Sequence, residues 1–267
     1  MLDIRDLCKT FARGTVNEHT ALNHVSVHVA DSDFVTILGS NGAGKSTLFG
    51  AIVGSFLVDG GHILLDGRDI TYQPDHKRAR AIGILFQDPM KGTAPDLTIE
   101  ENLSLAFNQG KRFPLARAVQ RKDVAMFRDQ LAAFGMGLED RMKMKVGLLS
   151  GGQRQAMTLL MATIASPRLL LLDEHTAALD PATAEKVLAI TVQIVEEQRI
   201  PTMMITHNMQ SALSIGNRTL MMDAGQIILD IAGNERAGMR VEDLMLLYSG
   251  KRGKALDNDR MLLSSVR

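Results

Sequence analysis

The sequence predicts an α/β fold with a mixed, mainly parallel sheet, and three observations support this. A buried strand at residues 33–38 runs into a glycine-rich turn and then a helix. Strands and helices alternate after Ser150, as in parallel sheets whose strands are joined by crossover helices. The stretch between Asp88 and Ser150 has helical periodicity, so we expect a helical subdomain inserted into the α/β unit.

The remaining elements follow from the apolar pattern. Residues 21–29 alternate apolar and polar side chains, the period of a strand with one buried face. The other expected elements are a helix at 47–54, strands at 62–66 and 82–86, a helix at 151–165, a strand at 168–173, a helix at 181–199 that begins with Pro181, a strand at 202–206, a helix at 208–215, a hairpin at 218–230 around Asp223, Ala224 and Gly225, and a helix at 241–248. From Lys251 onward we expect a mobile polar tail.

The composition is that of a globular protein without a dominant charge. The 267 residues carry 30 basic and 30 acidic side chains, so the formal net charge is zero. This balance argues against a basic nucleic-acid-binding face, and we expect no nucleic-acid partner. The length fits one large α/β domain or a domain with a smaller subdomain.

Cysteine content and apolar runs indicate a cytoplasmic protein. Cys8 is the single cysteine and cannot form an internal disulfide, so nothing requires an oxidising compartment. The N-terminal residues lack the apolar core of a signal peptide. The leucine run at 169–172 is far shorter than the roughly 20 residues that span a bilayer, so we expect a chain that does not cross a membrane by itself.

A phosphate-binding loop is predicted between the strand at 33–38 and the following helix. The segment GSNGAGKS fits the pattern G-x-x-x-x-G-K-[ST], in which glycines let backbone N–H groups face phosphate oxygens. Lys45 would reach the β- and γ-phosphates of a nucleotide, and the Ser46 hydroxyl would bind Mg²⁺. The alternative is a glycine-rich turn with a chance lysine. The expected nucleotide-binding residues of this segment are Gly39, Ser40, Asn41, Gly42, Ala43, Gly44, Lys45, Ser46 and Thr47.

Two acidic residues end the leucine-rich strand at 168–173. Ligands of open α/β sheets bind at the carboxyl ends of the strands. Asp173 can hold Mg²⁺ there, and Glu174 can act as the general base toward the attacking water. The alternative, a solvated acidic pair that caps a strand, would be preferred if no phosphate loop preceded it.

Between these two sites stands Leu149-Ser-Gly-Gly-Gln153, and here the sequence closely resembles the ATP-binding subunits of ATP-binding-cassette (ABC) transporters. The family's other motifs occur in the expected order: an aromatic residue near the N-terminus, a glutamine after a strand, an aspartate after the two acids and a histidine after a later strand. In this chain they are Phe11, Gln87, Asp180 (preceded by Ala178 and Leu179) and His207. The resemblance extends from Leu2 to about Leu247.

The resemblance implies the P-loop NTPase fold of ABC ATPases, with an antiparallel β subdomain beside the mainly parallel core. It implies a single ABC ATPase domain over residues 1–250. Within it, 1–88 and 151–250 would form the nucleotide-binding core with the β subdomain, and 89–150 the helical subdomain that leads into the signature motif. Residues 251–267 would be the polar tail.

The resemblance also assigns catalytic roles. Phe11 would stack on adenine, with a core aromatic as the alternative. Gln87 would touch Mg²⁺ or the attacking water, and His207 would hydrogen-bond the γ-phosphate and orient Glu174. The catalytic residues are then Glu174, His207, Gln87 and Lys45, and the Mg²⁺ residues are Ser46, Gln87 and Asp173.

The signature motif implies a dimer. Its residues, which would bind the ATP of a second subunit, are Ser150, Gly151, Gly152 and Gln153. Two chains would sandwich two ATP molecules head-to-tail, each held by Lys45 of one chain and Ser150 of the other. Asp180 would report across this interface.

The resemblance further implies membrane partners. The segment Met90–Leu97 resembles the groove in which such subunits receive a short helix of an integral-membrane permease, which places the chain peripherally on the cytoplasmic face of the cell membrane. The blocks TVNEHTAL, FQDPMKGTA and VGLLSGGQRQAMTLLMAT are most similar to ATPase subunits of bacterial uptake systems for tryptophan, tyrosine or related solutes. We therefore expect ATP-driven amino-acid import, with a solute-binding protein as an indirect partner. The alternatives are a soluble ABC ATPase of iron–sulfur assembly or another non-transport role, an ABC exporter ATPase and a nucleotide-sensing module without turnover.

Other residues are expected to be structural. Sixteen methionines, Met203, Met204, Met221 and Met222 among them, fit core positions. The histidines expected at the surface or in structural positions are His19, His24, His28, His62 and His76. His175 stands where the family usually has proline or alanine, and Ala178 replaces a common serine, but neither change removes a catalytic group. No cysteine or histidine cluster has metal-ligand spacing.

Overall fold

Contacts along the chain divide the computed structural model into two units. The first comprises Met1–Ala79 and the chain from Pro201 onward, and the second comprises Arg80–Ile200. The structure describes residues 1–109 and 119–252. The expected tail beyond Arg252 lies outside the described residues, whereas Lys251 still belongs to a helix, so the expected start of the tail is wrong at this position.

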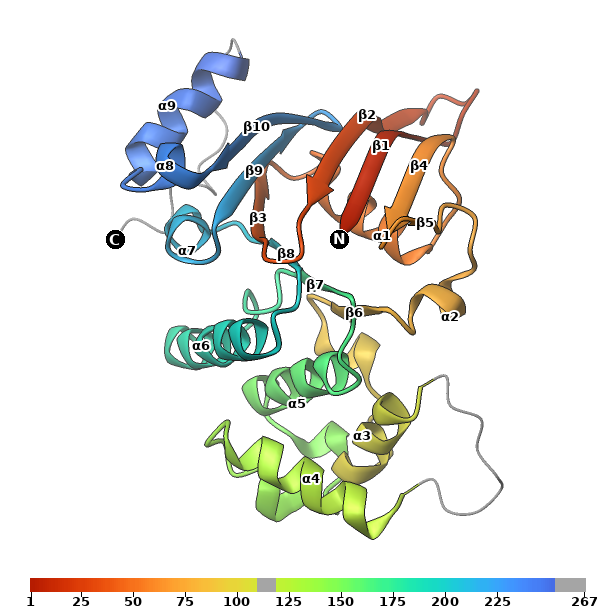
Figure 1. Cartoon of the computed structure of the whole chain (residues 1–267), viewed down its shortest axis with the longest axis vertical. Helices are drawn as coiled ribbons and strands as arrows, with labels where there is room; N and C mark the ends of the chain where they lie inside the picture. Colours follow the sequence, from red (N-terminus) through yellow and green to blue (C-terminus); the bar gives the residue numbers. More distant parts are fainter. Residues whose placement is uncertain (110–118, 253–267) are drawn as a thin grey trace. The chain divides into compact units, whose positions relative to one another are not determined.

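The first unit contains an antiparallel sheet in the order β2-β1-β4-β5, drawn in red to orange in Figure 1. Its strands are β1 (Leu2–Phe11), β2 (His19–Val29), β4 (Gly60–Leu65) and β5 (Arg68–Asp69). On β2 the buried residues Val25, Val27 and Val29 alternate with exposed ones, as the sequence pattern predicts. The antiparallel β portion expected from the family resemblance is thus present.

Strand β1 is not evident from the sequence pattern, and its irregular pairing explains why. Leu2, Ile4 and Leu7 are buried, so the apolar period slips by one residue after Ile4. Register shifts of the β1–β2 pair occur at this point, and Asp6 has φ 53° in the left-handed region. A bulge of this kind breaks the alternation by which a strand is recognised.

The strands β10-β9-β3-β8 of the first unit lie in that order in a second, mixed sheet. They are β3 (Phe34–Gly39), β8 (Thr202–Ile205), β9 (Arg218–Asp223) and β10 (Gln226–Ala232). Strand β3 pairs in parallel with β8 and β9, whereas β9 and β10 form an antiparallel hairpin. Every residue of β3 is buried, and the helix that follows it, α1 (Lys45–Val53), packs against β2 and β3.

Helices α7 (Met209–Ser214) and α9 (Val241–Arg252) share an apolar cluster with β3, β9 and β10. Leu244 and Tyr248, one turn apart on α9, are buried in this cluster. The helix ends at Arg252, past the expected end at residue 248. The methionines at 203, 204, 221 and 222 are buried as expected. Two short helices, α2 (Asp75–Arg78) and α8 (Gly233–Arg236), complete this unit's described elements.

The second unit pairs β6 (Ile82–Leu85) in parallel with β7 (Leu169–Asp173). Its helices, in yellow to teal in Figure 1, are α3 (Ile99–Phe107), α4 (Arg121–Ala132), α5 (Gly151–Thr163) and α6 (Pro181–Gln198). The 3₁₀ turns are η1 (Pro89–Gly92), η2 (Glu139–Arg141) and η3 (Val146–Leu148). The expected helical character of the stretch from Asp88 to Ser150 is confirmed for its described residues. A capping box of Thr98 and Glu101 fixes the start of α3.

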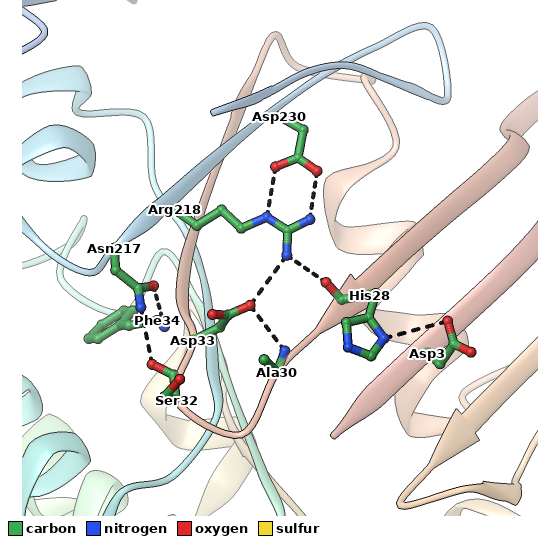
Figure 2. Close-up of polar contacts among 9 residues, drawn as sticks. All are labelled: Asp3, His28, Ala30, Ser32, Asp33, Phe34, Asn217, Arg218 and Asp230. Atoms are coloured by element: carbon green, nitrogen blue, oxygen red, sulfur yellow. Dashed lines mark hydrogen bonds and ion pairs between the residues drawn. The ribbon is translucent and has the colours of Figure 1, made fainter. Parts of the chain in front are cut away.

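Arg218 ties the turn before β3 to the hairpin β9–β10 (Figure 2). Its guanidinium donates to both carboxylate oxygens of Asp230, at 2.7 and 2.6 Å, and to the backbone oxygen of His28 at 2.6 Å. A further contact of 3.3 Å reaches Asp33, whose carboxylate also accepts from the Ala30 backbone N–H. Because β3 leads into the predicted phosphate loop, these contacts fix the strand that carries the loop.

A buried histidine anchors the turn after β7. His175 is 3% exposed, and its Nε2 lies 3.2 Å from Oγ1 of Thr191 on α6. The Thr191 hydroxyl donates to the Val187 backbone oxygen at 2.8 Å, so it accepts a hydrogen bond from His175 Nε2–H. Burial lowers the pKa of His175 to about 4, which means that the neutral ring is the folded-state form near pH 7.

We expect Arg218→Met to lower the free energy of unfolding by about 2 kcal/mol, because the half-buried carboxylates lose their partner. The Arg218 side chain is only 17% exposed, whereas Arg5, which pairs with Asp3, is 64% exposed. The control Arg5→Met should cost less than about 0.5 kcal/mol. Urea denaturation followed by circular dichroism measures both, and equal costs would show that the Arg218 contacts contribute nothing beyond a surface pair.

Lowering the pH from 7 to 5 should destabilise the protein through His175 by about 2 kcal/mol. The unfolded chain takes up a proton near pH 6.5, whereas the folded chain resists protonation down to about pH 4. The stabilisation is therefore complete above pH 6.5 and is lost as the pH falls toward 4. His175→Leu keeps a similar side-chain volume but does not titrate. In EDTA-containing buffer, the unfolding free energy of this variant should not show the part of the decrease with falling pH that His175 causes. Parallel curves for the two proteins would contradict the assignment.

Candidate functional site

The predicted phosphate loop, residues 39–46, joins β3 to α1. Gly39, Gly42 and Gly44 have φ values of 148°, 82° and 100°, in the region that favours glycine. A Cβ at Gly39 would lie 2.3 Å from the Met222 backbone oxygen, and one at Gly44 would lie 2.4 Å from that of Ala21. The loop therefore needs glycine for conformation at all three positions, and for close packing against β9 and β2 at two of them.

Lys45 opens α1 and folds back over this loop. Its Nζ donates to the backbone oxygens of Gly39 at 2.7 Å and Ser40 at 3.0 Å, and the residue is only 6% exposed. The ammonium thus lies inside the loop, where its charge and the N-terminus of α1 favour an anion. Ser46 follows on the first turn of α1, as the predicted order requires.

Two other predicted residues lie in the same unit. Phe11 ends β1 opposite His19 and is 38% exposed, so it is not the core aromatic of the alternative interpretation. His207 comes two residues after β8 ends, and Asn208 caps α7. Because β8 runs parallel to β3, the ends that lead to His207 and to the phosphate loop lie at the same edge of their sheet.

In the second unit the parallel strands β6 and β7 lead to Gln87 and to the acidic pair. Gln87 Nε2 donates to Glu174 Oε2 at 3.3 Å. Asp173 is the last residue of β7, and Glu174 follows with φ 47°, in the left-handed region. Such a conformation costs a non-glycine residue about 1 kcal/mol or more. The next residue is the buried His175, which holds the chain directly behind Glu174.

The signature residues begin helix α5. Ser150 is its N-cap: its hydroxyl accepts from the Gln153 backbone N–H, and the Gln153 side chain accepts from the Ser150 N–H, both at 3.3 Å. Gln153 Nε2 also donates to the Met136 backbone oxygen at 3.2 Å. Arg154 donates to three carbonyls of the preceding turn and so fixes the approach to the helix.

Gly152 brings the start of α5 close to the start of α6. A Cβ at Gly152 would lie 2.1 Å from Cγ2 of Thr183, so a side chain there would have to displace the Thr183 methyl group. Asp180 is the N-cap of α6 and accepts from the Thr183 backbone N–H at 3.0 Å, and its hydrogen bonds with Thr183 lower the pKa of its carboxyl. The N-caps of two helices, Ser150 and Asp180, are thus held near one another within this unit.

The predicted residues therefore fall into two sets. The first unit holds Phe11, Gly39, Ser40, Asn41, Gly42, Ala43, Gly44, Lys45, Ser46, Thr47 and His207, and the second holds Gln87, Ser150, Gly151, Gly152, Gln153, Asp173, Glu174 and Asp180. Hydrogen bonds join Lys45 to its loop, Gln87 to Glu174, and Ser150 to Gln153.

The oxygen donors predicted for Mg²⁺ fit that ion. A serine hydroxyl, an aspartate carboxylate and a glutamine carbonyl are hard ligands of the type Mg²⁺ prefers. Because the Gln87 amide nitrogen bonds Glu174, its Oε1 is the end that would serve a metal or its water. Among residues 1–109 and 119–252, no group of three or more His, Cys, Asp or Glu side chains could hold a metal. In the same part of the chain, no helix is long and apolar enough to cross a membrane.

Two supporting residues were not found by sequence reasoning. Phe56 packs edge-on against Phe11, and Thr191 accepts the hydrogen bond of His175. Each lies far from its partner in the sequence, within a turn or a helix of ordinary composition. No local sequence pattern distinguishes such a residue, so only the three-dimensional structure identifies it.

Comparisons with known proteins agree with this arrangement. The family model described as "ABC transporter" matches residues 22–177. The tyrosine transport ATP-binding protein of Clostridioides difficile is 41% identical over 92% of this chain and 97% of its own length. A methionine import ATP-binding protein of Corynebacterium efficiens is 33% identical over 85% of this chain and 61% of its own length.

Solved structures lead to the same fold. An ABC transporter cassette in its ADP conformation has a TM-score of 0.76 and 25% identity, covering 94% of this chain and 98% of that one. A dimeric cassette in a post-hydrolysis state with ADP and Pi has a TM-score of 0.73 and 26% identity, covering 87% and 98%. The phosphate loop, the acidic pair and the signature helix thus sit on the P-loop ABC ATPase fold, and the chain belongs to the ABC transporter family as an ATP-binding, ATP-hydrolysing subunit.

Proposed function

We propose that this chain dimerises head-to-tail around two MgATP molecules and drives an integral-membrane permease that imports a small solute such as an amino acid. The observation that supports the proposal is the arrangement of the motif residues, with Lys45 inside its loop and Glu174 directly after β7, where its carboxylate accepts from Gln87. The relative named for tyrosine transport supports the solute class. The binding of solute would lie in the permease and an associated solute-binding protein.

Each residue would take a separate role in ATP hydrolysis, according to the chemistry of its side chain. Lys45 and the loop N–H groups hold the β- and γ-phosphates, and Phe11 stacks on the adenine. Glu174 takes the proton of the attacking water, while His207 hydrogen-bonds the γ-phosphate. In the structure Glu174 Oε2 accepts a hydrogen bond from the Gln87 amide at 3.3 Å, which orients the carboxylate.

Mg²⁺ would be held by Ser46, Asp173 and Gln87. When bound, it neutralises charge on the β- and γ-phosphate oxygens. Asp173 would supply a carboxylate and Ser46 a hydroxyl to the ion, and Gln87 would supply an amide oxygen from the segment that follows β6.

Dimer formation would complete each site from a second chain. Ser150 and the first turn of α5 present backbone N–H groups at a helix N-terminus, which suits the γ-phosphate of a partner's ATP. Asp180 caps α6 beside them and would face the same interface. The division of residues 1–250 into a core and an inserted helical subdomain at 89–150 is part of this proposal.

The permease would dock on the segment 90–97. This segment begins three residues after Gln87 and is braced by Asn102 of α3, whose amide bonds Ala94 and the carbonyls of Leu97 and Thr98. Met90 is exposed on η1. A rigid segment beside the glutamine suits a lever between nucleotide and permease, and it would place the chain on the cytoplasmic face of the membrane.

Glu174→Gln should reduce ATP hydrolysis by about a hundred- to ten-thousand-fold, because the amide cannot accept the proton of water. Phosphate release with purified protein measures the rate, and size-exclusion chromatography with MgATP should show a stabilised dimer. Glu185→Gln, an exposed position on α6, is the matched control and should keep wild-type hydrolysis. A Glu174→Gln protein that hydrolyses ATP fully and stays monomeric would refute the mechanism.

Met90→Glu should abolish recovery of the permease with a tagged chain from gently solubilised membranes, because a charge would enter the apolar docking contact. The wild-type chain should recover a multi-span membrane protein by mass spectrometry. Leu246→Glu, at an exposed apolar position on α9, should recover it as well.

Loss of labelled tyrosine or tryptophan uptake on deletion of the chain would support import of that class. Recovery of soluble partners alone, with the wild-type chain absent from membranes, would favour a soluble assembly ATPase instead.

A further inference from the structure

Phe11 does not stand alone at the end of β1. Its ring contacts that of Phe56 with a centroid distance of 5.2 Å and an interplanar angle of 78°, which is an edge-to-face arrangement. Aromatic rings favour this geometry over a face-to-face sandwich. An edge-to-face contact engages at most one face of each ring, so at least one face of Phe11 is left uncovered by Phe56.

Phe56 is itself seated on the helix that begins at the phosphate loop. Helix α1 ends at Val53 and is capped by Gly54, which has φ 85°, and the chain then turns so that Phe56 packs over Gly50. A Cβ at Gly50 would lie 2.8 Å from Cε1 of Phe56. The glycine therefore leaves the space that the ring occupies, and α1 becomes the support of the aromatic pair.

Polar contacts fix residues 57–59 against the end of β1. Lys9 Nζ donates to the Leu57 backbone oxygen at 2.7 Å, and the Asp59 carboxylate accepts from the Thr10 N–H at 2.6 Å. The Lys9 ammonium also lies 5.2 Å from the Phe11 centroid and 5.5 Å from that of Phe56. The Lys9 side chain therefore contacts both aromatic rings through its ammonium group.

The pair also has a fixed place relative to the phosphate loop. Phe11 is opposite His19 in the β1–β2 register, and two residues further along β2 the Ala21 backbone oxygen lies against Gly44. Phe11 is thus tied to the loop through β2, and through Phe56 to α1. Its remaining exposed surface lies within the same unit as the loop that would hold the phosphates.

We propose that Phe56 is a positioning residue that orients the Phe11 ring for the nucleobase, and that the pair determines the base-dependent part of nucleotide affinity. This rests on the proposed stacking of adenine on Phe11. If the Phe11 ring is already ordered before the nucleotide binds, less side-chain conformational entropy is lost on binding, and the affinity is higher. Phe56 itself does not touch the reacting atoms.

The test compares MgATP with magnesium tripolyphosphate, which lacks the base, by isothermal titration calorimetry on the full chain. Phe56→Ala should weaken MgATP binding about three- to tenfold and leave tripolyphosphate binding unchanged. Phe56→Tyr keeps the ring edge and should restore affinity. Gly50→Ala should reproduce the loss without altering either ring. Leu57→Ala, at a neighbouring position that is 62% exposed, is the matched control and should bind as wild type.

A double-mutant cycle isolates the positioning role. In a Phe11→Ala background, Phe56→Ala should change MgATP affinity by less than about 1.5-fold, because the ring that it orients is gone. An equal loss for both ligands, or additive losses in the cycle, would overturn the proposal. If Phe56→Ala does not fold, Phe56→Leu and Gly50→Ala decide the same point.

The outcomes separate this inference from the function on which it rests. Selective loss of MgATP binding in Phe11→Ala, with wild-type binding in Phe56→Ala and Gly50→Ala, overturns only the positioning role. Equal binding of both ligands by Phe11→Ala and wild type overturns the adenine contact, and the positioning role with it.

Discussion

The backbone of the phosphate loop lies so close to its neighbours that no side chain fits at Gly39 or Gly44, and much of the first unit depends on this constraint. The carbonyls of Met222 and Ala21 occupy the space that a Cβ would need. Strands β9 and β2 therefore pack directly against the backbone of the loop. Lys45 then closes it from within, since its ammonium bonds the carbonyls of Gly39 and Ser40. The hairpin, the antiparallel sheet and α1 are all placed by their relation to this one segment.

The phosphate loop and the acidic pair were predictable as patterns because each lies in a short motif whose spacing follows from its mechanism, whereas Phe11, Gln87, Asp180 and His207 were assigned only from the family resemblance. The phosphate loop needs glycines and a lysine at fixed offsets, and the acidic pair needs only the end of a buried strand. The alternating elements after Ser150 were also predictable, since the strands β7 and β8 are short continuous apolar runs and the helices between them keep an undisturbed helical period. The helix at 181–199 and the strand at 202–206, for example, occur as α6 and β8 with ends shifted by one residue.

What the sequence could not provide depends on distant contacts or on irregular backbone. Strand β1 escaped prediction because its bulge after Ile4 breaks the alternation, and the last turn of α9, up to Arg252, is polar and carries no apolar period that predicts it. The seat of Phe56 on Gly50 and the hydrogen bond of His175 to Thr191 join residues with no shared local pattern. His175 was visible as a departure from the family's usual residues, but its burial behind Glu174 was not.

The contact between Gly152 and Thr183 has a mechanical meaning. With the backbone of one helix pressed against the side chain of the next, α5 and α6 cannot slide past each other at their first turns without a collision. The two capping residues at those turns, Ser150 and Asp180, then travel as a single block. A movement of the first turn of α5 would in this way also displace the first turn of α6, which begins directly after the turn that contains Glu174.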